Sequence, residues 1–252
     1  MLAIIDRTGL AQSSSMEILH RQVMRTPYGE PSDALTFGRL KGQEVMFLAR
    51  HTSSQAAPPH RVNYRANLWA LHEQGAKRVI SIAMAGGIRA DLEPGTIILP
   101  DQLIDYTYDR EFTFFDERDH PPKHIDFSLP YTPSLRRQIL DAAQRVKMTC
   151  LNGGVYAAMQ GPRLETIAEV NRMERDGADM VGMTGMPEAA LARELELHYA
   201  AIVVVVNPAA GRGSSQGMSL EKISTVSQHA MAQVSSILES VVEHAGEYDN
   251  GS

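Results

Sequence analysis

Six short apolar runs, several of them rich in β-branched residues, recur along the chain and alternate with segments of helical spacing. Each run is bounded by glycine, proline or charged residues, which is typical of buried strands. The six runs are residues 2–5, 44–49, 78–83, 96–99, 155–159 and 199–206. Because strands that alternate with helices form a parallel or mixed sheet covered on both faces, the expected fold class is α/β.

Three segments carry apolar residues three and four positions apart, as in an amphipathic helix. The first precedes Gly75, a residue type that often ends helices at positive φ. The second begins at Thr132-Pro133, where a capping hydroxyl precedes a proline of preset φ, and the third begins at Ser219. The three apolar faces are Val62, Ala66, Trp69 and Ala70; Leu135, Ile139, Ala142 and Val146; and Ile223, Val226, Ala230, Val234, Ile237 and Val241.

The length of 252 residues and the hydrophobic fraction of 43% suit one large α/β domain. No repeat, low-complexity tract or long linker divides the chain. We expect a single domain over residues 1–246 and a polar tail over 247–252. Residues 115–130, which contain His and Pro, are predicted to form an ordered excursion at the surface.

The charge balance excludes several kinds of partner. Asp and Glu number 30 against 24 Lys and Arg, so the formal charge of −6 argues against non-specific binding to nucleic acid or to an anionic membrane.

No run approaches the roughly 20 apolar residues of a membrane span. Asp6 and Arg7 interrupt the apolar N-terminus where a secretory signal would continue, and a single Cys150 fits a reducing compartment. The expected location is the cytoplasm.

Polar or glycine-containing groups follow five of the predicted strands, at residues 6–9, 50–54, 84–87, 161–165 and 207–211. Ligands of α/β proteins bind at the carboxyl ends of strands. The first three groups combine hydroxyls, glycine amides, an Arg and a His, which are the donors that phosphate needs. The same residues also fit plain turns, with Arg50 in a surface ion pair. Neither glycine group matches a P-loop or a dinucleotide fingerprint.

Asn207 ends a run of four valines, and its amide can donate and accept hydrogen bonds side by side. It equally fits an Asn that closes a turn before Pro208. The nine histidines are scattered without metal-ligand spacing, so no metal site is predicted. The serine pairs at 53–54 and 214–215 lack the strand-turn-helix context of a catalytic nucleophile.

Three long motifs carry a family resemblance: PPHRVNYRANLWAL at 58–71, PGTIILPDQLIDYTYDREFTFF at 94–115, and MQGPRLETIAE with GADMVGMTGMPEAALARE within 159–194. With LAIIDRTGL at 2–10, they resemble the trimeric branch of the purine nucleoside phosphorylase family over almost the whole chain. That branch includes methylthioadenosine and methylthioinosine phosphorylases. The resemblance implies an α/β domain around a mixed, partly closed sheet, reversible phosphorolysis of a purine nucleoside, and a homotrimer. It also implies that phosphate is a co-substrate and that no organic cofactor or metal is needed.

The resemblance assigns roles to individual residues. Those that match phosphate-binding positions are Thr8, Arg50, His51 and Thr184, with the amide of Met84 as a helper. Met183 matches the residue that lies against the ribose. His124 matches a residue that reaches the 5′ end of the sugar from a neighbouring protomer, although it also fits a solvated loop histidine. Three departures predict a rearranged phosphate site, namely Asp6-Arg7 for Gly-Gly, Gln55 near a usual His, and Ala83 for a usual Thr.

The residues that match the base pocket favour a 6-oxopurine. Glu165 stands where family members of that type accept N1–H, and Asn207 stands where an amide serves O6 and N7 of the leaving base. The other matched substrate-binding residues are Leu164, Pro208 and Ala209. Adenine-specific relatives have a small hydroxyl residue and aspartates there instead, so hypoxanthine is the predicted base. Glu165 taken alone also fits a carboxylate in the first turn of a helix.

Leu220, flanked by Met218, matches the position where ordinary nucleoside phosphorylases carry a histidine for the 5′-hydroxyl. An apolar wall suits a methylthio group better than a hydroxyl. Leu220 also fits the first core residue of the last helix. The predicted substrate is 5′-methylthioinosine. The alternatives are a methylthioadenosine phosphorylase, a general inosine and guanosine phosphorylase, and a non-catalytic nucleoside-binding protein.

Overall fold

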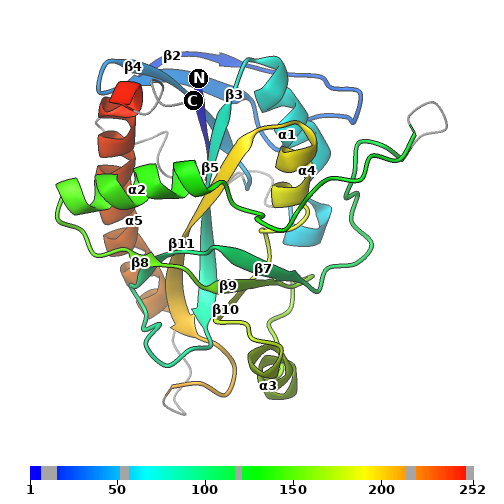
Figure 1. The fold of residues 1–252 in the computed structure, drawn as a ribbon, viewed down its shortest axis with the longest axis vertical. Coiled ribbons are helices and arrows are strands. Elements are labelled where there is room, and N and C mark those ends of the chain that lie inside the picture. The colour runs from blue at the N-terminus through cyan, green and yellow to red at the C-terminus, as the bar shows by residue number, and fades with distance from the viewer. Residues whose placement is uncertain (7–15, 52–56, 117–120, 214–219, 248–252) are drawn as a thin grey trace.

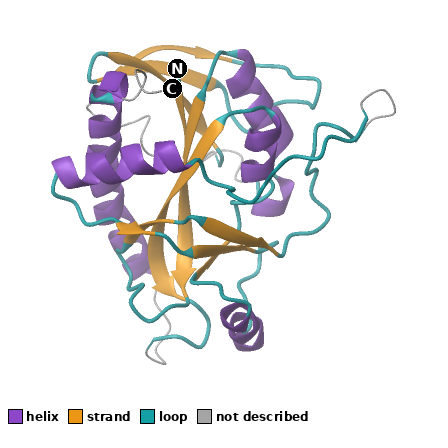
Figure 2. Cartoon of the chain, viewed as in Figure 1, coloured by secondary structure: helices purple, strands orange, loops and turns teal. Residues whose placement is uncertain are grey.

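The computed structural model describes residues 1–6, 16–51, 57–116, 121–213 and 220–247 (Figure 1). In this part of the chain, eleven strands form one mixed sheet that is flanked by five α-helices (Figure 2). The strands are β1 (Leu2–Asp6), β2 (Met16–Gln22), β3 (Leu35–Leu40), β4 (Gln43–Ala49), β5 (Arg78–Gly87), β6 (Ile97–Leu99), β7 (Gln102–Asp105), β8 (Leu151–Asn152), β9 (Val155–Ala158), β10 (Met180–Gly182) and β11 (His198–Pro208). The α/β fold class is confirmed.

The sheet is built around β5. One path runs β2-β3-β4-β1-β5-β10-β9-β7, and a branch leaves β5 through β11 and β6 to β8. β1, β4, β5 and β11 are parallel, whereas β10 runs antiparallel to β5. The central strands are buried almost throughout, which explains why they appear in the sequence as continuous apolar runs.

Two of the predicted strands exceed their expected bounds by more than one residue, and five strands were not predicted. β5 continues to Gly87 and β11 to Pro208, because these two strands pair along their whole length. The unpredicted strands are β2, β3, β7, β8 and β10. β2 is an exposed edge strand held by antiparallel pairing to β3, and β8 and β10 have only two and three residues. Such strands depend on their partners and leave little periodicity in the sequence.

The helices divide between the faces of the sheet. α2 (Pro133–Arg145) and α5 (Leu220–Glu243) pack against one side of β11, while α1 (Tyr64–Glu73) and α4 (Glu188–Glu194) pack together on the other (Figure 1). α3 (Ile167–Arg175) begins with a capping box between Thr166 and Glu169. Neither α3 nor α4 was predicted as an element.

The predicted helix ends are largely correct. Gly75 follows α1 with φ of 84°, and α2 begins at Pro133 as expected. The predicted cap at Thr132 is wrong in one respect, because its hydroxyl makes no cap bond. The hydroxyl instead accepts a hydrogen bond from the Tyr199 amide at 3.0 Å. Ser219, the predicted start of the last helix, lies outside the described residues, and α5 is described from Leu220.

The segment between β7 and α2 has neither helix nor strand in its described part, and it extends away from the sheet (Figure 1). In the predicted surface excursion, residues 115–130, every described side chain but Pro130 is exposed or half-buried, and residues 117–120 lie outside the described part of the chain. Tyr108, Phe112 and Leu129 on this segment are 69%, 67% and 54% exposed. The division into a domain of 1–246 and a tail stays a prediction. Of the helices described, none is both long and apolar enough to cross a membrane.

Candidate functional site

The parallel strands bring several of the predicted groups to one edge of the sheet. Asp6 and Ala49 are register partners at the ends of β1 and β4, so Arg50 lies beside the end of β1 and its amide donates to the Asp6 carbonyl at 2.7 Å. Asn207 of β11 is opposite Gly86 of β5. The Ala209 amide then donates to the Gly87 carbonyl at 2.8 Å. Strand pairing therefore joins residues that are 44 positions apart in the first contact and 121 and 122 positions apart in the other two.

The loops after β9 and β10 lie near Met84 of β5. This is because β10 runs antiparallel to β5 and parallel to β9. A Cβ built on Gly182, the last residue of β10, would lie 3.0 Å from the Met84 carbonyl oxygen. Met183 and Thr184 follow directly and are half-buried. A Cβ on Gly161, in the loop after β9, would lie 2.6 Å from the Met183 sulfur. Met84, Met183, Thr184 and the loop that leads to Glu165 are thus neighbours.

Arg50 is buried and forms an ion pair with Glu188 of α4, a residue that was not predicted as part of the site. The Nε and Nη2 groups donate to the two carboxylate oxygens of Glu188, each at 2.9 Å, and the exposed fractions of the two side chains are 2% and 0%. Ser81 and Tyr199 also donate to this carboxylate, at 2.6 and 2.8 Å. The expectation of an Arg50 ion pair at the surface is wrong, since the pair lies in the core.

The guanidinium of Arg50 has limited capacity left for a ligand. Besides Glu188, it donates to the Ser81 hydroxyl at 2.7 Å and to the Ile82 carbonyl at 3.2 Å. These four bonds use four of the five N–H groups of an arginine. Glu188 also neutralises most of its charge. An anion bound here could therefore accept a hydrogen bond from only one N–H group of Arg50. The other four N–H groups hold the guanidinium in a fixed position.

The loop between β9 and α3 presents Glu165 half-buried, with Leu164 71% exposed beside it. Burial raises the pKa of the Glu165 carboxyl above its ordinary value. The neighbouring Arg163 does not compensate, because it is committed to Glu169 through two bonds of 2.7 and 2.8 Å. Within the described residues, Glu165 has no hydrogen-bond partner outside its own backbone. Its carboxylate is therefore available to an N–H donor.

Asn207 is half-buried at the end of β11, and its Nδ2 donates to the Pro208 carbonyl at 2.7 Å. This contact uses one of the two amide hydrogens and leaves the second hydrogen and the Oδ1 acceptor for other partners. Close packing fixes the neighbouring backbone, since a Cβ on Gly86 would lie 3.3 Å from the Cα of Ala209.

The remaining predicted residues fall into three groups. His51 is half-buried, and its Nδ1 lies 2.9 Å from the Ala57 carbonyl. His124 is exposed on the segment between β7 and α2, and it is not brought to the residues above within this chain. Thr8 and Met218, like Arg7 and Gln55, lie outside the described residues, and so does the side chain of Leu220.

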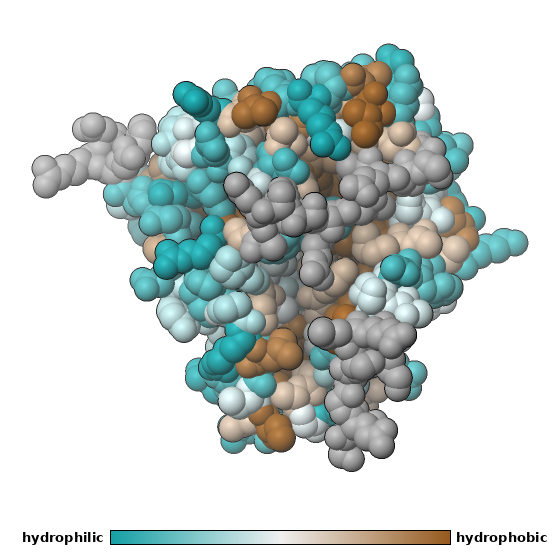
Figure 3. All heavy atoms as spheres, turned by 180° about the vertical axis from the view of Figure 1, so that it is seen from behind, coloured by the Kyte–Doolittle hydropathy of each residue, from teal (hydrophilic) through white to brown (hydrophobic). Residues whose placement is uncertain are grey.

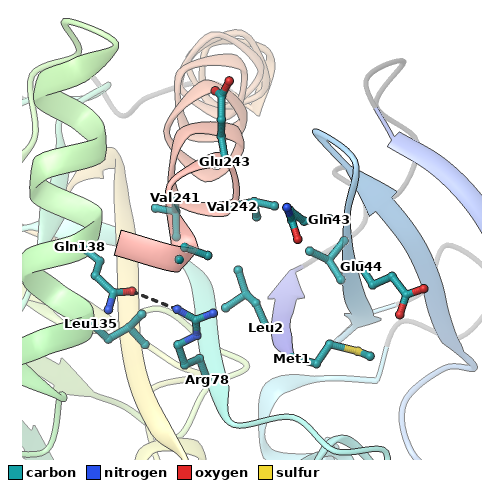
Figure 4. Close-up of a pocket in the computed structure, with 13 residues that line it drawn as sticks. Met1, Leu2, Gln43, Glu44, Arg78, Leu135, Gln138, Val241, Val242 and Glu243 are labelled. Carbon is teal, nitrogen blue, oxygen red and sulfur yellow. Dashed lines mark hydrogen bonds between the residues drawn. The ribbon is translucent and has the colours of Figure 1, made fainter. Parts of the chain in front are cut away.

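A separate cavity of about 260 Å³ lies at the other end of the parallel strands, where β1, β4 and β5 begin (Figure 4). Leu2, Leu135 and Val242 supply apolar walls, and Arg78 donates to Gln138 at 3.5 Å across it. Since the strands are parallel, this cavity is on the edge opposite to Asn207. Seen from behind, the surface mixes hydrophobic and hydrophilic side chains in small groups (Figure 3).

The phosphorylase superfamily model matches residues 3–243. The chain belongs to the phosphorylase superfamily. A Pseudomonas syringae pv. tomato protein named probable S-methyl-5′-thioinosine phosphorylase is 47% identical over 240 residues, which are 95% of this chain and 97% of that protein. The 6-oxopurine nucleoside phosphorylase of Pyrococcus furiosus is 40% identical and covers 83% of this chain and 80% of its own length. The crystal structure of a methylthioadenosine phosphorylase from an antarctic soil metagenomic library is 31% identical, has a TM-score of 0.92, and the match covers 98% of this chain and 86% of that one.

These similarities confirm the family resemblance drawn from the motifs. Two residues of this phosphorylase that carry the site geometry were nevertheless missed. Glu188 lies within the motif GMPEAALARE, but a glutamate at a helix start is usually solvated, and only its burial marks it out. Arg110 lies within the motif that ends in EFTFF and is 7% exposed. A buried arginine is rare enough to be informative, but burial is not visible in a sequence.

Proposed function

We propose that this phosphorylase cleaves 5′-methylthioinosine with phosphate and gives hypoxanthine and 5-methylthioribose 1-phosphate. The observation that carries the proposal is the Glu165 carboxylate, which is half-buried and has a pKa raised by burial, while the neighbouring Arg163 makes its direct ion pair with Glu169 instead. The similarity to relatives named probable S-methyl-5′-thioinosine phosphorylase, at 47% identity, supports the same substrate.

The purine edge decides between hypoxanthine and adenine. Hypoxanthine offers an N1–H donor to the Glu165 carboxylate and an O6 acceptor to the Asn207 amide. Adenine offers an acceptor at N1 and an amino donor at position 6, so its N1 lone pair would face an anionic oxygen. Each unsatisfied buried polar group costs about 1–3 kcal/mol. Two mismatches therefore correspond to a preference of at least about 30-fold for the 6-oxopurine.

The proposed reaction is a displacement at the anomeric carbon of the sugar. A phosphate oxygen bonds to C1′ on one face while the C1′–N9 bond breaks on the other and the purine leaves with the electron pair. Arg50, His51 and Thr184, with Thr8 and the Met84 amide, position the phosphate, whose charge stabilises the cationic sugar. Asn207 donates to the purine as negative charge collects at N7 and O6. Inorganic phosphate is the co-substrate, and the reaction needs no organic cofactor or metal.

We place Met183 against the ribose, next to the loop that carries Glu165, and Leu164, Pro208 and Ala209 around the base. The 5′-methylthio group would contact Met218 and Leu220. The proposed assembly is a homotrimer in which His124 of one protomer reaches the sugar bound by its neighbour. The segment that carries His124 also exposes Tyr108, Phe112 and Leu129, which would be candidates for contact with the neighbouring protomer in this assembly. We place the protein in the cytoplasm.

A second candidate is a general 6-oxopurine nucleoside phosphorylase. The similarity to the Pyrococcus furiosus 6-oxopurine nucleoside phosphorylase favours it, at 40% identity. Glu165 and Asn207 read the same purine edge in both candidates. The residues proposed around the 5′ position, Met218 and Leu220 with His124 of a neighbouring protomer, would separate the two substrates.

The deciding experiment measures base release from methylthioinosine, methylthioadenosine and inosine, with and without inorganic phosphate. We expect phosphate-dependent release of hypoxanthine, with the highest kcat/KM for methylthioinosine and at least about 30-fold less for methylthioadenosine. A preference for inosine would support the second candidate. A preference for methylthioadenosine would contradict the roles of Glu165 and Asn207. Hypoxanthine binding without any phosphorolysis would indicate a non-catalytic binding protein.

A further inference from the structure

Arg110 is a buried arginine whose partners are neutral. Its Nη2 donates to the carbonyls of Met159 and Gln160 at 2.9 and 2.8 Å, and its Nη1 donates to the carbonyls of Met183 and Met186 at 2.9 and 2.5 Å. The Nε donates to the Gln160 side chain at 3.1 Å. Among the described residues, no carboxylate pairs with this guanidinium. A charged group buried against carbonyl oxygens without a counterion is costly, so the geometry of this arginine calls for an explanation.

The four carbonyls belong to the two loops that line the proposed site. Met159 and Gln160 follow β9 and begin the loop that leads to Glu165. Met183 and Met186 follow β10, on either side of Thr184 and just before Glu188, the partner of Arg50. All four carbonyl groups lie beyond the last residues of β9 and β10, outside the ladders of the sheet. Arg110 supplies donors to both loops at once and so fixes the distance between them.

We infer that Arg110 is a positioning residue that sets the base-reading loop against the ribose- and phosphate-binding loop. This inference rests on the proposed function. It assigns no contact between Arg110 and substrate. The planar fork of arginine presents five N–H groups in fixed directions, whereas lysine has three donors on one atom. Lysine therefore keeps the charge at this position but cannot hold both pairs of carbonyls.

The test compares Arg110→Lys with Arg136→Lys as a matched control. Arg136 also binds strand-end groups, through the carbonyls of Pro100 and Leu99 at 2.9 and 3.2 Å and the Asn152 side chain at 2.6 Å. It lies beyond the ends of β6 and β8, and β6 runs antiparallel to β11 and away from Asn207. Both variants lose an arginine fork that holds backbone, but only Arg110 spans the proposed site.

We expect kcat/KM for methylthioinosine to fall about 100-fold in Arg110→Lys, because misplacement of binding groups by about 1 Å has an effect of this size. The fall should lie mainly in kcat, and the preference over methylthioadenosine should shrink as Glu165 moves. Arg136→Lys should keep its kcat/KM within about threefold of wild type at a comparable loss of melting temperature. In Arg110→Ala, added methylguanidinium should restore part of the activity.

Amide hydrogen exchange gives a readout that does not depend on activity. In Arg110→Lys, exchange should rise together in residues 159–166 and 183–188, while the amides of β1 and β11 stay protected. A wild-type protein without phosphorolysis would refute the proposed function, and exchange would still decide the role of Arg110. Equal kinetic losses in the two lysine variants, or exchange that rises evenly along the chain, would overturn the inference.

Discussion

The buried pair of Arg50 and Glu188 gives the most quantitative prediction. Replacing Glu188 by Gln keeps the size and shape of the side chain but removes its negative charge. In the wild-type protein the Arg50 guanidinium donates to both carboxylate oxygens of Glu188 at 2.9 Å. Glutamine would replace one of these acceptors by an NH₂ group, so that two donors would face each other. Arg50, only 2% exposed, would then be a buried cation without a counterion.

The expected loss of stability in Glu188→Gln follows from the burial of both charged side chains. Breaking a fully buried ion pair costs about 3–5 kcal/mol, because the partner charge is left uncompensated. For a chain of this size, about 2–4 °C of melting temperature is lost per kcal/mol. Glu188→Gln should therefore melt roughly 6–20 °C below wild type. Removing the cation as well should restore part of this loss, so Arg50→Met combined with Glu188→Gln should be more stable than Glu188→Gln alone.

Urea and thermal unfolding, followed by circular dichroism at pH 7, measure these differences. Glu194→Gln is the matched control, since Glu194 is 7% exposed and, among the described residues, its carboxylate accepts only from neutral donors, the Thr113 hydroxyl at 2.7 Å and the Phe114 amide at 2.8 Å. Its loss should be about 1–3 kcal/mol. The reasoning is refuted if Glu188→Gln costs no more than Glu194→Gln, or if Arg50→Met deepens the loss instead of relieving it.

Three further predictions concern the proposed site. Asn207→Ala should lower kcat/KM about 100- to 1,000-fold, the usual cost of a lost donor to developing negative charge, with a melting temperature close to wild type; equal activity would remove Asn207 from the mechanism. Burial raises the pKa of Glu165, and protonation removes the negative charge that strengthens its bond with N1–H, so kcat/KM for methylthioinosine should fall as pH drops through that pKa. Glu165→Gln should abolish this acidic limb, and an unchanged pH profile would contradict the role. Gly161→Ala should lose about 1–3 kcal/mol of stability to backbone strain at φ of 64° and also raise KM, since its Cβ would lie 2.6 Å from the Met183 sulfur. Gly177→Ala, with φ of 95° and open space around its Cβ, is the strained control that should leave KM unchanged in the same steady-state assay.

Much of the fold could be predicted because its central strands are buried on both faces. β1, β4 and β11 each contain a continuous apolar run, and such a run can be recognised without knowledge of the strands it pairs with. The helix signals at Gly75 and Pro133 were equally local. The short strands β8 and β10 were missed because pairing with β6 and β9 stabilises them, not any pattern of their own.

The candidate site, like the fold, could be predicted only in part. The sequence by itself determined which residue types stand after each strand, including Glu165 and Asn207, and its long motifs placed the chain in a family. Only the tertiary structure decided that Arg50 is held by Glu188, 138 positions away, and that Arg110 joins two loops about 50 and 75 positions further along. The physical reason is that hydrogen bonds and burial depend on distances across the fold. The sequence specifies the type of each side chain, but which residues that side chain contacts depends on how the strands pair.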